Sequence, residues 1–338
     1  MHVSVALIRA FADGLFRLGV PAERFCADAG IAMERLSDPT DMLSVVEYGR
    51  ALEAARVLSG DPAFALRVGE SAPTGALHTV GYLLINCTTM RDAIAQFVAH
   101  AALIYEEAYW ELRELDDQAT FSYDHPVVPD EAAALDAEFC LAHIVGVGRN
   151  FAGRDIAPRE VRFRHPAPAH AGEYDAVFRC PVVFDRERNE IVFKRKLLDI
   201  PHLHRDESIA QLLRGRADAL LAERQSDARL RQRIIDLIKY QPDLESIDAE
   251  TLAGQLGLGP RTLRRRLASL QVSLFTLIDE ARCELACEAL SAATPIKEIA
   301  ARLGFSEVSA FHRAFKRWTG TTPGQYRTFH RTRARSSA

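Results

Sequence analysis

Arginine side chains recur at helical spacing in a segment that reads PRTLRRRL. Arg261, Arg264 and Arg265 are separated by three and four positions along the helix, so they share one face. Leu263 and Leu267 fall on another face and can pack inward. A guanidinium group binds phosphate oxygens and can donate two hydrogen bonds to the edge of a guanine. The pattern favours a polyanionic partner, although an arginine-rich face that is only solvated has the same spacing.

A second polar face is predicted near the C-terminus, where Val308, Ser309, His312 and Arg313 recur at helical spacing. Arg313, like Arg265, is long enough for a bidentate contact with guanine. Ser309 and His312 can donate or accept at a base edge, and Val308 could touch a thymine methyl group. These residue types in one place are those that read base sequence.

A helix, a tight turn and a second helix must position this second face. The first helix has an apolar stripe made by Ile296, Ile299, Ala300 and Leu303. Gly304 follows, where the chain needs a residue that is free to adopt positive φ. Ser306 can cap the next helix, and Phe311 and Phe315 anchor it. A helix pair that exposes a polar face is typical of a DNA-reading helix-turn-helix, and a hairpin that only packs is the alternative.

The arginine face has a similar frame upstream. Residues 247–256 predict a helix, Gly257 a turn, and Pro260 the first turn of the next helix. Between the two frames, residues 274–290 predict one helix of roughly 25 Å at ~1.5 Å per residue. Such a helix could hold the two faces near one DNA turn, ~34 Å, apart. One protomer could then read two successive major-groove segments.

These C-terminal segments resemble the AraC/XylS family of bacterial transcription regulators. The matching residues are Ile299-Ala300, Leu303-Gly304-Phe305, Ser309, Phe311, Arg313-Ala314-Phe315-Lys316, Gly320, Thr322-Pro323 and Tyr326-Arg327, and upstream Leu252-Ala253, Leu256-Gly257 and Pro260 to Leu267. The resemblance implies an all-α domain with two helix-turn-helix units joined by a long helix. It places base contacts at Arg261, Arg264, Arg265, Val308, Ser309, His312 and Arg313.

Further basic residues suit contacts with the DNA backbone. Lys316, Arg317 and Arg327 lie toward helix ends and could hold phosphates, which fix register without carrying sequence. Arg261 and Arg264 could serve bases or phosphates, and the sequence does not separate these roles. Family members often carry Ser where this chain has Gly259, which weakens the predicted helix cap.

Charge is divided unevenly along the chain. From residue 229 to the end there are 18 Lys and Arg and 11 Asp and Glu, giving +7, and the remainder holds 42 − 18 = 24 basic and 46 − 11 = 35 acidic residues, giving −11. A basic module beside an acidic one predicts a polyanion partner for the C-terminal part alone.

The first ~200 residues mix helices and strands, which predicts an α+β domain. Helical patterns occupy residues 5–18, 23–29, 43–58, 75–86, 90–102 and 131–150, with Pro62 restarting a helix between the third and fourth. Strand patterns occupy residues 108–112, 119–123, 161–164, 182–184 and 191–193, the first two forming a hairpin.

This part of the chain resembles the effector-binding domain, called arabinose-binding-like, of one branch of AraC-type regulators. The resemblance rests on Gly81 to Leu84, Met90 to Ala93, Val161 to Pro168, Tyr174, Phe178 and Pro181 to Phe184. It implies a small-molecule effector, but the label does not make arabinose the ligand.

These patterns predict four segments. Residues 1–205 form an effector-binding and dimerisation domain, and 206–227 a helical linker with a polar break at 224–227. Residues 228–330 form the double helix-turn-helix domain, and 331–338 a basic tail.

Motifs for catalysis, cofactors and metals are missing from the sequence. It contains no GxSxG, HExxH or glycine-rich phosphate loop. The six cysteines form no CxxC pair, and Cys283 and Cys287 lack further nearby ligands. His202 and His204 have no third ligand nearby, and His165 is interpreted as a turn residue. We therefore expect no enzyme activity, no cofactor and no metal.

The sequence thus predicts a cytoplasmic, ligand-responsive regulator without membrane segments. The expected partners are double-stranded promoter DNA, an unknown small-molecule effector, RNA polymerase and a second copy of the chain. Activation is the expected mode, although repression gives the same sequence pattern. The alternatives are an architectural regulator whose N-terminal domain only dimerises and an enzyme fused to a DNA tether.

Overall fold

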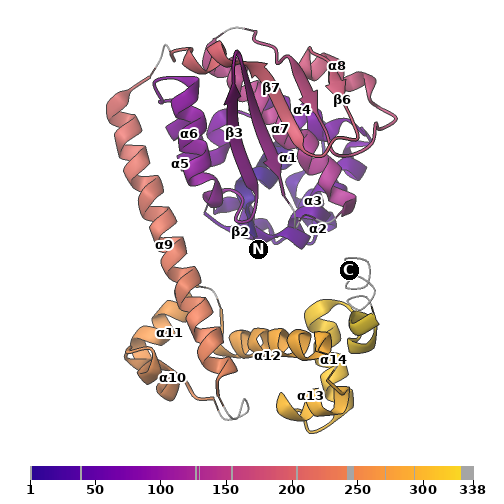
Figure 1. Cartoon of the computed structure of the whole chain (residues 1–338), viewed down its shortest axis with the longest axis vertical. Coiled ribbons are helices and arrows are strands. Elements are labelled where there is room, and N and C mark those ends of the chain that lie inside the picture. Colours follow the sequence, from indigo (N-terminus) through magenta and orange to yellow (C-terminus); the bar gives the residue numbers. More distant parts are fainter. Residues whose placement is uncertain are drawn as a thin grey trace. The chain divides into compact units, whose positions relative to one another are not determined.

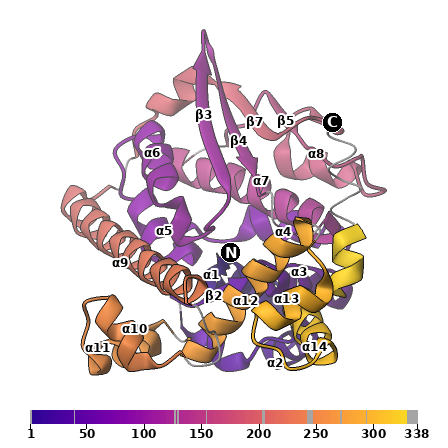
Figure 2. The ribbon, with the colours of Figure 1, turned by 60° about the horizontal axis from the view of Figure 1, so that its bottom comes forward.

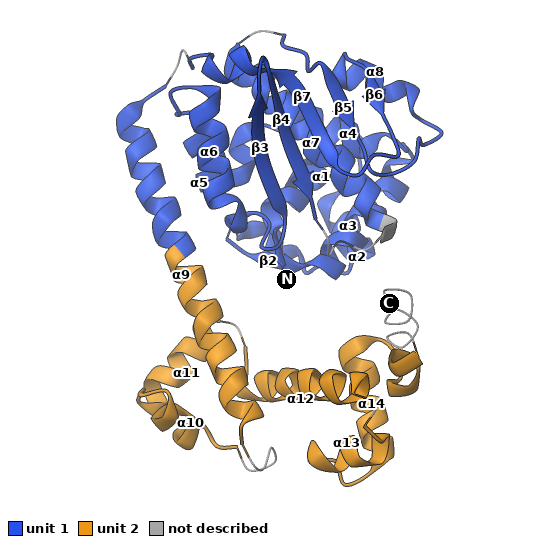
Figure 3. Ribbon diagram, in the orientation of Figure 1, with its two compact units in different colours: residues 1–221 blue, residues 222–338 orange. Residues whose placement is uncertain are grey.

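Contacts divide the chain of the computed structural model into two units, residues 1–221 and 222–338 (Figure 3). The structure describes residues 2–38, 40–125, 128, 130–153, 155–202, 205–241, 247–270, 272–292 and 294–328. The first unit combines helices with a sheet and the second is helical, which confirms the predicted fold class. His204 and the predicted basic tail, 331–338, lie outside the described residues.

Helices make up most of the first unit (Figure 1). They are α1 Val5–Arg17, α2 Ala22–Ala29, α3 Val45–Ser59, α4 Phe64–Ser71, α5 His78–Leu84, α6 Met90–His100, α7 Asp130–Ala152 and α8 Gly172–Phe178, with 3-10 helices η1 Met33–Ser37, η2 Thr74–Leu77, η3 Ala101–Leu103 and η4 Arg195–Asp199. The helix predicted from residue 43 begins at Val45, because β2 (Met42–Ser44) first pairs with β1 (His2–Ser4). Pro62 lies in the turn before α4 and not in its first helical turn.

Besides the β1-β2 pair, the first unit has a five-stranded sheet with the strand order β3-β4-β7-β5-β6. Its strands are β3 Tyr109–Leu115, β4 Gln118–Asp124, β5 Glu160–Arg162, β6 Val182–Val183 and β7 Asn189–Lys194. The predicted hairpin is present, with Leu115 opposite Gln118 and a turn at Asp116, whose φ of 52° is a left-handed conformation that Asp tolerates. β5 and β6 pair in parallel, and the other neighbours are antiparallel.

α7 packs between α4 on one side and strands β4 and β7 on the other. Glycines bring α4 and α7 into backbone contact. A Cβ built at Gly146 would lie 2.7 Å from the carbonyl oxygen of Glu70, and one at Gly69 would lie closer still to that of Phe139. This close crossing places the inward face of α7 against the sheet.

The second unit consists of helices in the described residues (Figure 2). They are α9 Glu207–Lys239, which begins in the first unit, α10 Ala249–Gln255, α11 Pro260–Ser269, α12 Leu274–Ser291, α13 Ile296–Arg302 and α14 Val308–Thr319, with residues 323–328 also helical. The break predicted at 224–227 is wrong, because α9 continues through it. Arg and Gln are good helix formers, and a polar stretch without Gly or Pro does not end a helix.

α9 contributes to both cores. Leu213 and Leu220 pack against the core of the first unit, while Ile234 and Ile238 are fully buried in that of the second. No helix among the described residues combines the length and apolar character that crossing a membrane would require.

Candidate nucleic-acid interface and ligand cavity

The first candidate recognition helix is α11, which follows α10 after a turn at Gly257 with φ 68°. Leu263 and Leu267 are buried and fix the orientation of the helix. Gly259 occupies the N-cap position without a side-chain hydrogen bond, as the sequence predicted. Pro260 follows at the first helical turn, where a missing N–H is harmless.

Three of the four arginines of α11 are exposed and unpaired in the part of the chain that the structure describes. These are the predicted Arg261, Arg264 and Arg265. Arg266 differs, because its guanidinium lies 3.4 Å from a carboxylate oxygen of Asp227 on α9. The structure therefore brings the three predicted side chains together on one accessible face.

The second candidate recognition helix is α14, held by buried Phe311 and Phe315. Its partner α13 ends before Gly304, which has φ 78°. The predicted cap at Ser306 is wrong: the chain is still extended at Glu307, which occupies the N-cap position without a side-chain cap bond. The Glu307 carboxylate instead accepts a hydrogen bond from Ser309 Oγ at 3.0 Å.

The exposed face of α14 carries the residues singled out in the sequence. Val308, Ser309 and Arg313 are exposed, and His312 is half-buried with its ring against Phe311. The Ser309 hydroxyl must leave Glu307 before it can donate to a base. Arg313 forms no ion pair with any described residue.

The residues suggested for phosphate contacts have different surroundings. Lys316 is exposed and has no ion pair within the described ranges. Arg317 lies 2.7 Å from a carboxylate oxygen of Asp279 on α12. Arg327 is half-buried and donates a hydrogen bond to the carbonyl of Thr294. Arg317 and Arg327 therefore already have partners within the second unit.

α12 connects the two helix pairs (Figure 1, Figure 2). It has 18 residues, which corresponds to roughly 27 Å at ~1.5 Å per residue. Its buried residues join one core that also contains Leu263 of α11 and Phe311 of α14. Its carboxylates Glu284 and Glu288 bind Lys239 of α9 at 3.2 and 2.7 Å. The lysine thus offsets part of the negative charge on this side of α12 within the unit.

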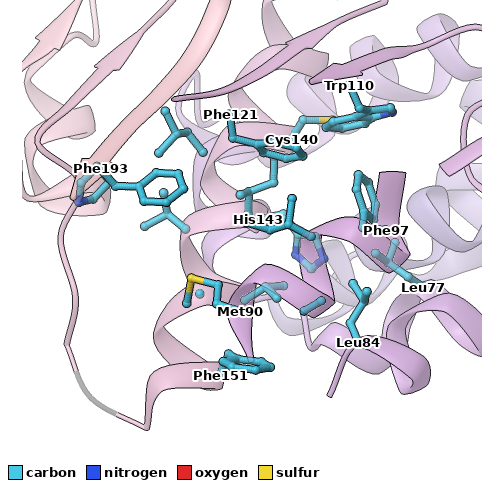
Figure 4. Close-up of a pocket in the computed structure, with 18 of the residues that line it drawn as sticks. Leu77, Leu84, Met90, Phe97, Trp110, Phe121, Cys140, His143, Phe151 and Phe193 are labelled. Carbon is cyan, nitrogen blue, oxygen red and sulfur yellow. The ribbon is translucent and has the colours of Figure 1, made fainter. Parts of the chain in front are cut away.

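The first unit contains a cavity of about 130 Å³ that lies mainly between α6, α7 and the sheet (Figure 4). Its wall is almost entirely aliphatic and aromatic and includes Leu77, Leu84, Met90, Phe97, Trp110, Phe121, Cys140, His143, Phe151 and Phe193. No Asp, Glu, Lys or Arg occurs among the described lining residues. The wall is partly exposed at Ile156 and Pro158, where the cavity approaches the surface.

Sequence reasoning did not find these lining residues. α7 is apolar on most sides, so residues that line the cavity share one pattern with residues that fill the core. His143 was the available signal, because a histidine is unusual inside an apolar helix.

A buried polar network lies next to the cavity. Asp136 on α7 accepts hydrogen bonds from the hydroxyls of Tyr48, at 2.8 Å, and Tyr123. Burial raises the pKa of its carboxyl to about 6. One turn along α7, the Cys140 thiol lies 2.8 Å from the hydroxyl of Tyr105. Cys140 and Tyr105 line the cavity, so the network connects the cavity wall to a buried acid.

Other candidate groups do not assemble into a site. The six cysteines are free thiols. No cluster of three or more His, Cys, Asp and Glu suited to a metal occurs in the described ranges. The His165 ring is half-buried against Phe163, with Nδ1 2.9 Å from the carbonyl oxygen of Pro166, a local arrangement consistent with a turn.

Comparisons with known proteins agree with this architecture. The model of the family described as the arabinose-binding domain of AraC transcription regulators matches residues 19–202, and a helix-turn-helix model matches residues 252–328. The ornithine utilization regulator of Pseudomonas aeruginosa is 29% identical over 96% of each chain. The regulator VirS of Mycobacterium tuberculosis is 26% identical over 85% of each.

Among solved structures, the regulator CdpR from Pseudomonas aeruginosa aligns over 90% of this chain and 96% of its own, with a TM-score of 0.44 and 23% identity. The C-terminal domain of AraT from Geobacillus stearothermophilus is 35% identical and covers 30% of this chain and 84% of its own, with a TM-score of 0.25.

Proposed function

The chain belongs to the AraC family of transcription regulators, and we propose that its helices α11 and α14 read successive segments of promoter DNA. It is a transcription regulator with an N-terminal effector-binding domain and a C-terminal helix-turn-helix domain. One observation carries the proposal: two exposed polar faces, whose arginines have no ion pair among the described residues, lie on helices that share one core through α12. The sharing of a core favours a fixed spacing between the two faces.

Each exposed side chain has a proposed role. Arg265 and Arg313 donate to guanine edges, while Arg261 and Arg264 contact bases or phosphates. Ser309 and His312 contact base edges, and Val308 packs on a thymine methyl group. These roles follow from chemistry and accessibility.

Lys316 is the leading phosphate contact because it has no internal partner among the described residues. Arg317 can share its guanidinium between Asp279 and a phosphate. Arg327 needs to leave Thr294 first, so its contribution to DNA affinity is expected to be the smallest of the three.

The apolar cavity is the proposed effector site. Concave, mainly apolar pockets are the usual ligand sites in such domains. The effector binds without chemical change and shifts the balance between DNA-competent and DNA-incompetent arrangements. The name of the ornithine utilization regulator makes amino acids one class to test.

We further propose that the chain acts as a cytoplasmic homodimer that contacts RNA polymerase and activates transcription. The alternatives are an architectural regulator with no effector and an enzyme domain on a DNA tether. Thermal-shift screening of the full-length chain against metabolites separates them. A hit without turnover supports the effector role, turnover supports the enzyme, and silence across a broad library supports the architectural role.

Selection of binding sites from random DNA tests the reading mode directly. The expected result is a site with two preferred segments about one helical turn, ~34 Å, apart on one face. Footprinting should then protect both segments at the same protein concentration. A single short segment, or a random distance between two, would contradict the bipartite mode.

A further inference from the structure

The wall of the cavity limits the chemistry of its ligand. The described lining residues include no charged side chain, and polar side-chain atoms come mainly from Tyr105, Trp110, Cys140 and His143. The Tyr105 hydroxyl and the Cys140 thiol already bind each other at 2.8 Å. Two side chains, Trp110 and His143, are left to interact with a polar group of a ligand.

His143 can serve as a hydrogen-bond acceptor. Its Nδ1 lies 3.3 Å from the carbonyl oxygen of Gly69, and a carbonyl can only accept, so Nδ1 carries the proton. Burial lowers the pKa of the ring to about 4, so the second nitrogen is unprotonated near neutral pH. This Nε2 atom is buried and has no partner in the described part of the chain. It is an unused acceptor, which an N–H or O–H of a ligand can reach if the ring shifts slightly toward the cavity.

Trp110 has the opposite role. Its indole Nε1–H can only donate, and it is also buried without a partner among the described residues. A buried polar group without a hydrogen bond is destabilising, because it has lost its contacts with water and gained none in the protein. A ligand that satisfies either atom recovers part of this cost, which gives the cavity a preference beyond its apolar wall.

We propose that the cavity binds an uncharged, mainly hydrocarbon or aromatic molecule that donates one hydrogen bond to His143 and offers at most one acceptor to Trp110. This inference rests on the proposed effector role of the cavity. A free amino acid would bury two charges without a counter-ion, and burial of an unpaired charge is very unfavourable. A sugar would bury several hydroxyl groups against two available partners.

Gly148 on α7 allows a mild test of the cavity, because it belongs to the wall. A Cβ at this position would make ordinary contacts, 3.7 Å to Ile156 and 3.8 Å to Met90. Gly148→Ala should therefore fold normally. Gly148→Leu places a larger side chain where a ligand would lie.

The experiment is a fluorescence titration of the full-length chain with two matched dyes. N-phenyl-1-naphthylamine is uncharged and has one N–H donor, whereas 1-anilinonaphthalene-8-sulfonate adds a sulfonate to the same rings. The uncharged dye should bind at one saturable site, about tenfold more tightly than the sulfonate. Gly148→Leu should weaken its binding about tenfold, while Gly148→Ala should leave it nearly unchanged.

Several outcomes overturn the proposed ligand class. In the first, binding of the uncharged dye does not saturate, or Gly148→Leu does not weaken it. In the second, the sulfonate dye binds as tightly as the uncharged dye, and Gly148→Leu abolishes that binding. In the third, ornithine or arabinose displaces the uncharged dye. Circular dichroism of Gly148→Leu confirms that the variant is folded.

Operator affinity distinguishes this inference from the proposed function. If a polar compound changes the operator affinity of the wild type but not of Gly148→Leu, the effector site stands and the ligand class is wrong. If the dye results are as expected but Gly148→Leu retains the full operator response to an effector, the ligand class stands and the effector role of the cavity fails.

Discussion

Arg265 and Arg266 are adjacent in sequence but differ in their surroundings. Arg265 is exposed and unpaired among the described residues, whereas Arg266 faces Asp227. Arg265→Ala should lower specific DNA affinity by about 1–3 kcal/mol and relax preference at one base pair. Arg313→Ala should do the same in the other DNA segment. Quantitative binding to a series of single-base operator variants measures both effects.

Arg266→Ala is the matched control for this experiment. It removes the same charge from the same helix, but an exposed ion pair contributes only about 0–1 kcal/mol to stability. We expect a small loss of affinity that is the same for every operator variant. If Arg265→Ala gives this uniform loss as well, Arg265 contacts a phosphate and not a base.

Asp136 should make stability depend on pH. Its carboxyl has a pKa of about 6 in the folded chain because it is buried, compared with ~3.9 when unfolded. Between these two values the folded state binds the proton more strongly, so this group's contribution to stability falls as pH rises from 4 to 6. Asp136→Asn removes that dependence. Relative to wild type, the variant should therefore gain stability across this window and keep a constant difference above it.

Urea unfolding of both proteins from pH 4 to pH 7 measures this difference. The variant must be compared with the wild type at each pH, because two buried histidines make the stability of both proteins rise with pH. Burial lowers the pKa of His125 and His143 to about 4. A difference that does not change with pH would show that Asp136 is ionised throughout the window.

At the scale of elements, the crossing of α4 and α7 depends on glycine. Gly146→Ala would push a methyl group against the carbonyl of Glu70, 2.7 Å away, and overpacking of this kind costs about 1–3 kcal/mol. Gly148→Ala on the same helix meets only ordinary contacts. It should be neutral or stabilise by up to about 1 kcal/mol, because Ala favours helix more than Gly does.

Chemical unfolding of the two alanine variants checks this contrast. Equal stabilities would mean that the helices separate at little cost. The close packing of α4 against α7 also brings the carbonyl oxygen of Gly69 within 3.3 Å of Nδ1 of His143, which lines the cavity. Gly146→Ala should therefore disturb the cavity as well as the fold.

Elements with strong periodicity were predictable from the sequence, and so were the exposed polar faces of α11 and α14. Phe311 and Phe315 fix one face of α14 inside, so the exposed face follows from helical spacing alone. The predicted secondary structure was wrong where it depends on a contact with a residue distant in sequence, or on the composition of a longer segment. The strand at Met42 exists because β1 pairs with it, and the polar residues of α9 form helix because they contain no breaker.

The cavity could not be predicted in this way. Its wall is assembled from α5, α6, α7 and the sheet, and each contributing residue has the pattern of a core residue. The partners of Arg317 and Arg327 were also missed, since ion pairs and hydrogen bonds across 38 and 33 positions leave no mark in the local sequence.

At the scale of the whole molecule, the division between the acidic and the basic part of the chain lies close to the boundary between the two structural units. Residues 229–338 carry a net charge of +7 and residues 1–228 one of −11, and this division lies on α9, close to the boundary between the units at residues 221 and 222. A net negative unit is repelled by DNA, and a net positive unit is attracted. The charge distribution therefore favours contact through the second unit, which leaves the first free for the effector.

α9 is the covalent route between effector and DNA, and its continuity should matter for regulation. Ser226 is exposed in the interior of this helix, one residue before Asp227, whose carboxylate lies 3.4 Å from Arg266 on α11. Ser226→Pro removes a backbone hydrogen bond and breaks the helix at a local cost of about 3 kcal/mol. Because each unit has its own core, the variant should still bind both operator and effector. Its operator affinity should no longer change when the effector is added.

Ser226→Ala keeps the helix and should respond as the wild type does. Operator titrations with and without an effector found by screening the full-length chain measure the response of all three proteins. A Ser226→Pro variant that keeps the full response would show that coupling does not need an unbroken α9. Loss of operator binding itself would instead mean that the helix break reaches the core around Ile234 and Ile238, which are fully buried in the second unit.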